Sequence, residues 1–97
     1  MLESLTHESF RPHLASAFRV EHAGTSVTLT LIEVTVLGGD TASARRQPFS
    51  LLFRGPRVPL LPQRIHRLEH ERMGGLELFI VPLGPDGDGL RYEAIFT

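Results

Sequence analysis

Cysteine and lysine are both absent from this chain of 97 residues, and all 10 of its basic side chains are arginines. The absence of cysteine excludes disulfide bonds, thiolate catalysis and zinc sites built on cysteine. The absence of lysine excludes a Walker-type phosphate loop, a Schiff-base lysine and the lysine of protein kinases. The fold must therefore be stabilised by non-covalent packing, and several large enzyme classes are excluded by composition.

Long apolar runs are also missing. No stretch could span a bilayer as a helix, and the first residues include Glu3 and Glu8 where a signal peptide needs a basic start and then an apolar run. Hydrophobic residues make up 41% of the chain and charged residues 22%, which is near the average of globular proteins. We therefore expect one cytoplasmic domain over residues 1–97, with one modest core and no membrane contact.

Two apolar runs, residues 76–83 and 90–96, are separated by a turn signal at residues 84–89 that is rich in glycine and aspartate. This pattern predicts a β-hairpin. Alternation predicts one core-facing side for both strands, formed by Leu76, Leu78, Ile80, Leu90, Tyr92, Ala94 and Phe96. Phe79, Val81 and Leu83 are left on the opposite side, so we expect the first strand to be covered twice, in a central place or at a barrel corner.

The longest strand candidate, residues 26–37, changes phase part-way. Its apolar residues occupy odd positions as far as Leu31 and even positions from Ile32 onward. A β-bulge or a sheet corner near these two residues would let both halves face one core. The alternative is a strand buried on both faces.

The other segments are assigned from local composition. Residues 1–16 are expected to be helical or irregular, because Thr6 can cap a helix that Pro12 keeps short. Residues 17–97 form the β core, with a solvated connection at 38–48, a strand at 49–54 and then an extended crossing. Residues 63–73 stay open between helix, which their composition favours, and strand, which the alternation around His66 and His70 favours.

These patterns indicate an all-β protein of about six mostly antiparallel, sequentially connected strands with a short N-terminal helix. A small antiparallel β-barrel and a two-layer sandwich would satisfy the same alternation, so the choice between them stays open. The oligomeric state also stays open, because an exposed edge strand would allow a homo-oligomer.

Several strings of residues resemble a small bacterial family of unknown function. They are FSLLFRGP at 49–56, LPQ at 61–63, RLEH at 67–70, LELFIVP at 76–82 and YEAIF at 92–96, together with Phe10 and FRV at 18–20. The resemblance implies a fold and a genomic context, since family members often lie beside phage-tail-collar-like proteins, and it implies no catalytic residues. A proline often follows the family position of His70, which implies a strand there, although Glu71 takes that place in this chain.

The candidate metal ligands are five histidines, His7, His13, His22, His66 and His70. On a strand His66 and His70 would lie roughly 13 Å apart, too far for one metal ion, so we predict partly buried, hydrogen-bonded strand residues. The turn with Asp86 and Asp88 lacks the bidentate glutamate of a calcium loop, and no nucleophile elbow is present. We expect no metal, no other cofactor and no enzyme activity.

The arginines are concentrated in the middle of the chain. Residues 41–68 contain six arginines and no acid, whereas residues 1–40 carry five acids and two arginines and residues 69–97 carry six acids and two arginines. This basic band is the candidate interaction surface, formed by Arg45, Arg46, Arg54, Arg57, Arg64 and Arg67. The alternative is neutralisation within the molecule, with Arg64 or Arg67 paired to Glu69, Glu77 or Glu93 at roughly 0.2 to 1 kcal/mol each.

Three functions follow from these observations. We expect a non-catalytic structural or adaptor protein that binds another protein and, as the resemblance implies, is accessory to a phage-tail-like assembly. The first alternative is a small ligand-binding β-barrel or an enzyme of unrecognised type. The second is anion or nucleic-acid binding through the basic band, which the net charge of −1 and the inward phase of Phe49 and Phe53 do not favour.

Overall fold

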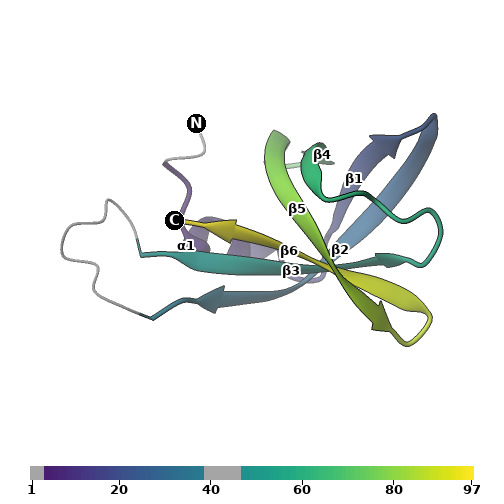
Figure 1. Cartoon of the computed structure of the whole chain (residues 1–97). Helices are drawn as coiled ribbons and strands as arrows, with labels where there is room; N and C mark the ends of the chain where they lie inside the picture. Colours follow the sequence, from purple (N-terminus) through teal and green to yellow (C-terminus); the bar gives the residue numbers. More distant parts are fainter. Residues whose placement is uncertain (1–3, 39–46) are drawn as a thin grey trace.

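The computed structural model describes residues 4–38 and 47–97 of the chain (Figure 1). After two short helical turns, α1 (His7–Phe10) and η2 (Arg11–His13), the chain forms six strands. The strands are β1 (Ala17–His22), β2 (Thr25–Val36), β3 (Phe49–Pro56), β4 (Arg64–His70), β5 (Gly74–Asp86) and β6 (Gly89–Phe96). They form a closed barrel in the order β1-β2-β3-β6-β5-β4, with every pairing antiparallel. The predicted all-β class is confirmed, and the barrel is the observed architecture.

The segment that stayed open at residues 63–73 contains strand β4 and the turn into β5. His66, Leu68 and His70 point inward from β4 and are buried, while Arg67 lies on the solvent side. The good helix formers in this segment are overridden by pairing with β5 on one side and with β1 on the other. No helix in the described part of the chain is long and apolar enough to cross a membrane.

The two halves of the barrel repeat one plan. Strands β1, β2 and β3 have 6, 12 and 8 residues, and strands β4, β5 and β6 have 7, 13 and 8. The long central strand of each half shifts register once, between Leu31 and Glu33 in β2 and between Pro82 and Gly84 in β5. The predicted bulge near Leu31 and Ile32 is therefore confirmed, and each long strand passes from one neighbour to the next just before its bulge.

The two seams that join the halves differ in length. Strand β3 pairs with β6 along its entire length, from Phe49 opposite Phe96 to Pro56 opposite Gly89. Strand β1 meets β4 only where Arg19 and Val20 lie opposite Glu69 and Leu68. The barrel is thus closed by a long seam between β3 and β6 and by a short seam between β1 and β4.

Side chains fill the barrel interior. Phe18, Phe53 and Tyr92 are fully buried, and the predicted inward side of the closing hairpin is confirmed at Leu76, Leu78, Ile80, Tyr92, Ala94 and Phe96. Phe10 of α1 lies 5.9 Å from Phe49 and 5.5 Å from Phe96 between ring centroids, so the N-terminal segment covers one end of the barrel. The short helix expected at the N-terminus is observed over His7–Phe10, and it changes to a 3-10 turn at Arg11 and Pro12.

Candidate interaction surface

An exposed apolar patch lies on the outer face of β4, β5 and β6. Ile65 on β4 is 63% exposed, Phe79 on β5 is 51% exposed and Ile95 on β6 is 56% exposed. Ile65 and Phe79 are direct cross-strand partners. The outer side of the closing hairpin, for which we expected a second cover, is therefore open to solvent at Phe79 within the described chain.

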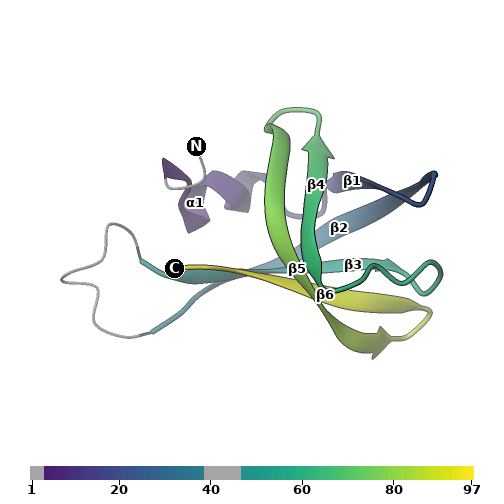
Figure 2. The same cartoon turned by 45° about the horizontal axis from the view of Figure 1, so that its top comes forward.

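A groove separates the β5 and β6 sides of this patch. Strand β5 pairs with β4 from Gly74 to Ile80 and with β6 only from Val81 onward. Figures 1 and 2 show the first half of β5 rising with β4 while the end of β6 runs away from it along β3. The resulting β5–β6 groove has a volume of about 280 Å³ and is lined by Ile65, Glu77, Leu78, Phe79, Ala94, Ile95, Phe96 and Thr97.

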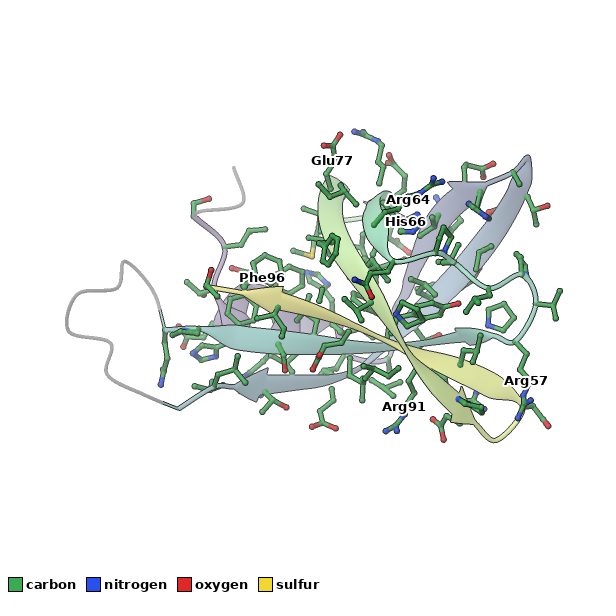
Figure 3. All side chains as sticks on the ribbon, in the orientation of Figure 1. Arg57, Arg64, His66, Glu77, Arg91 and Phe96 are labelled. Atoms are coloured by element: carbon green, nitrogen blue, oxygen red, sulfur yellow. The ribbon has the colours of Figure 1, made fainter. Side chains whose placement is uncertain are left out.

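The charged side chain at the groove is that of Glu77, which Figure 3 places toward the start of β5. Its cross-strand partner is Arg67, but the Arg67 guanidinium bonds to the carboxylate of Glu69 and lies over Gly75. No ion pair of Glu77 is formed within residues 4–38 and 47–97. The groove therefore combines apolar walls with one charged side chain, that of Glu77, at its β5 side.

The arginines of the basic band lie in two places. Arg54 and Arg57 reach the β5–β6 turn, where Arg54 donates to the carbonyl oxygen of Asp86 at 2.9 Å and Arg57 donates to that of Gly87 at 3.0 Å. The Arg54 guanidinium also lies 3.4 Å from the Asp86 carboxylate. Arg64 and Arg67 lie on β4, and Figure 3 shows Arg64 well apart from Arg57. Arg45 and Arg46 fall outside the described residues.

His70 is the histidine with the most complete set of partners. It is only 5% exposed, and its Nδ1 accepts hydrogen bonds from the backbone N–H groups of Arg72 at 3.1 Å and Met73 at 3.2 Å. In the neutral ring the proton must then lie on Nε2, which donates to the Ser16 hydroxyl at 2.9 Å. The Ser16 hydroxyl in turn donates to the carbonyl oxygen of His13.

This arrangement decides what the Ser16 and His70 pair can do. Burial lowers the pKa of His70, with His13 and Arg72 lowering it further and Glu71 acting in the opposite direction. The neutral ring is favoured, but its Nε2 already carries a proton and cannot accept one from Ser16. The pair therefore fastens the N-terminal segment to β4 and lacks the tautomer that a general base for a serine nucleophile needs.

His66 has a similar structural role. It is 5% exposed, and its Nε2 lies 2.8 Å from the carbonyl oxygen of Pro62, which ties β4 to the crossing that precedes it. The prediction that His66 and His70 are hydrogen-bonded strand residues is confirmed, and both are buried more completely than the partial burial that we predicted. Over the described residues no three histidine, aspartate or glutamate side chains are grouped as metal ligands.

Sequence reasoning missed the β5–β6 groove, although the signal for it was present. The closing hairpin is apolar on both faces, and the structure leaves Phe79 at 51% and Leu83 at 46% exposure on the outer one. Single exposed hydrophobic residues are ordinary in soluble proteins, but several around one groove are characteristic of interaction sites.

These features define a class of protein, a closed six-stranded antiparallel β-barrel with a filled interior and a helical N-terminal cover. The chain belongs to the family described as a domain of unknown function, DUF6916, whose model matches residues 5–96. Comparisons with curated proteins and with solved structures gave no significant match.

Proposed function

We propose that this chain is a non-catalytic adaptor or structural module that binds another protein through the outer face of β4, β5 and β6. The observation that carries the proposal is the exposed apolar patch of Ile65, Phe79 and Ile95 around the β5–β6 groove. Burying such side chains against a partner contributes roughly 25 cal/mol per Å² of apolar surface removed from water. An exposed apolar patch lowers the solubility of a protein, and binding to a partner removes the patch from water.

The other two functions have less support from the geometry. The interior that a ligand-binding barrel would need is occupied by Phe18, Phe53 and Tyr92, all fully buried. Two arginines of the basic band form ion pairs within the chain, Arg54 with Asp86 and Arg67 with Glu69, which supports neutralisation within the molecule over nucleic-acid binding. Adaptor binding is therefore the function that we put forward.

The cellular setting of the module is a more specific proposal than its binding surface. We propose that the module works in the cytoplasm as an accessory of a bacterial phage-tail-like assembly. The bacterial origin and the phage-tail-like assembly are what the family resemblance implies. A gene neighbourhood that contains tail-collar-like genes would support this setting, and a neighbourhood with no structural phage-type genes would count against it.

The proposed function is tested by comparing three baits in a lysate of the native host. The baits are the wild-type chain, a Phe79→Asp variant and an Ile32→Asp control, since Ile32 is 40% exposed at the β2 bulge away from the patch. A photo-crosslinking residue at position 95 identifies what touches the patch. We expect one protein to be crosslinked and then, as a purified partner, to bind wild type and Ile32→Asp alike but Phe79→Asp at least tenfold more weakly. Equal binding by all three baits, or no crosslinked protein, would refute the proposal.

A further inference from the structure

We infer that the β5–β6 groove binds an extended segment of a partner protein. The segment adds as an extra strand to the side of β5 that no described strand pairs with over residues 76–80, and it carries apolar side chains at alternate positions and a basic residue. This inference rests on the proposed function and specifies the chemistry of the partner. It does not follow from an exposed apolar patch alone, which could equally bind a helix.

The backbone of β5 is the first reason. Over residues 76–80 the described strand pairings join β5 to β4 on one side, and pairing with β6 on the other side begins only at Val81. Five residues of strand extend over roughly 16 Å at about 3.3 Å per residue. A strand side of this length presents a row of backbone donors and acceptors, and an extended peptide satisfies them in the way that other sheet edges bind peptides.

The size and lining of the groove are the second reason. Leu78 and Ala94 are buried lining residues, whereas Phe79 and Ile95 are half exposed and flank the opening. A cavity of roughly 150 Å³ accepts benzene, so the 280 Å³ of this groove has room for about two apolar side chains. Alternate residues of a strand point to the same side, which places such a pair two positions apart in the bound segment.

The equivalent place in the other half of the barrel gives an internal comparison. There a notch of about 370 Å³ lies where the first half of β2 leaves β3. Its lining combines the polar side chains of Thr28, Thr30, Arg54 and Asp88 with two glycines and the apolar side chains of Ile32 and Pro56. The repeated architecture therefore produces a notch in each half, but only the second is walled mainly by apolar side chains. The apolar lining belongs to the β5–β6 groove itself and is not required by the fold.

The charge of Glu77 favours a partner segment over a second copy of this chain as the occupant of the groove. Glu77 lines the groove while its cross-strand neighbour Arg67 is bonded to Glu69. A two-fold pairing of two β5 strands would bring two Glu77 carboxylates into one short stretch of sheet, and like charges on neighbouring strands are destabilising. An arginine or lysine on a partner segment would instead complement Glu77, so the structure favours a basic partner strand.

A random library of 12-residue peptides displayed on phage tests the inference with the full chain as target. Selection against wild type, after depletion on the Phe79→Asp variant, should enrich peptides with apolar residues at i and i+2 and a basic residue near them. Synthetic copies should bind at least tenfold more weakly to Phe79→Asp and about threefold to tenfold more weakly to Glu77→Arg, and should be unaffected by Ile32→Asp. N-methylation of every second backbone nitrogen of the peptide should abolish binding for one of the two alternating sets of nitrogens and not for the other. Amide exchange of residues 76–80 of this chain should slow when the peptide is bound.

Each other outcome overturns the inference. A basic partner strand would be excluded by any one of three results. These are enriched peptides with apolar residues at i and i+4, unchanged peptide affinity for both variants, and no enriched peptide. Sedimentation showing a wild-type dimer that Phe79→Asp converts to a monomer would identify a second copy as the occupant. If the native partner is crosslinked at position 95 but contacts the groove through a helix, the proposed function stands and this inference fails. If no partner is crosslinked, both fail.

Discussion

Removing a single oxygen atom from Tyr92 should destabilise the barrel measurably. The Tyr92 hydroxyl accepts a hydrogen bond of 3.1 Å from the backbone N–H of Leu61, and both residues are fully buried. Leu61 lies in the crossing between β3 and β4, which joins the two halves of the barrel. Because the N–H of Leu61 faces the interior, water cannot replace the lost acceptor in a Tyr92→Phe variant.

The magnitude follows from the group that is left unsatisfied. A buried donor without a partner costs about 1 to 3 kcal/mol, and the phenyl ring of phenylalanine retains the packing of the tyrosine ring. For a domain of 60 to 100 residues each kcal/mol lowers Tm by roughly 4 to 8 °C. We therefore expect Tyr92→Phe to lower the free energy of unfolding by about 1 to 3 kcal/mol while the barrel fold is kept.

Urea denaturation followed by circular dichroism measures this loss, and amide exchange at Leu61 should become faster in the same variant. A matched control is Thr35→Val, because the Thr35 hydroxyl bonds at 2.8 Å to the carboxylate of Glu33 on the exposed surface. The control should stay within about 0.5 kcal/mol of wild type. If Tyr92→Phe also stays within that range, or if exchange at Leu61 is unchanged, the assignment of this hydrogen bond as a tether is wrong.

Three further predictions concern pH, the β5 bulge and the basic band. Burial lowers the pKa of His70 below its usual 6.5, so the folded state binds that proton less readily than the unfolded chain. The contribution of His70 to stability should therefore be fully present above pH 6.5 and be lost as the pH falls below it. A His70→Gln variant should show a flatter Tm profile than wild type between about pH 7 and 5, and an equally steep profile would refute the assignment. Gly84 has a φ of +129° at the bulge, so Gly84→Ala should lower the free energy of unfolding by about 1 to 3 kcal/mol, as measured by urea denaturation. An unchanged free energy of unfolding would mean that the strand can adopt another register. The ion pair of Arg54 with Asp86 is exposed at 43% and 44%, so Arg54→Ala should cost less than about 1 kcal/mol by the same assay, and a larger loss would show that the arginine anchors the turn.

Much of the fold could be predicted because its signals are local. The alternation in the closing hairpin determined which side of β6 is buried, and the change of phase at Leu31 and Ile32 located the β2 bulge. By contrast, residues 63–73 contain good helix formers, and only the distant pairing partners Arg19 and Val20, together with β5, make β4 a strand. The choice between barrel and sandwich depended on the same long-range contacts, which a local pattern does not encode.

The candidate site was less predictable for a related reason. Clustering of arginines along the sequence suggested one basic surface, but the folded chain brings Arg54 to the β5–β6 turn and leaves Arg67 on β4. The apolar outer side of β5 was visible in the sequence, whereas its exposure depends on where the pairing of β5 passes from β4 to β6, between Ile80 and Val81. Whether an apolar side is covered is a property of the assembled barrel.

The brief seam between β1 and β4 has a consequence for how the barrel opens. Ser16 directly precedes β1 and His70 ends β4, so their hydrogen bond lies beside the seam where only Arg19 and Val20 pair with the opposite strand. Local opening begins where cooperative contacts are fewest. Protonation of His70 in mild acid should therefore weaken this short seam first. Strand β1 and the N-terminal segment should then separate from β4 before the long seam between β3 and β6 opens.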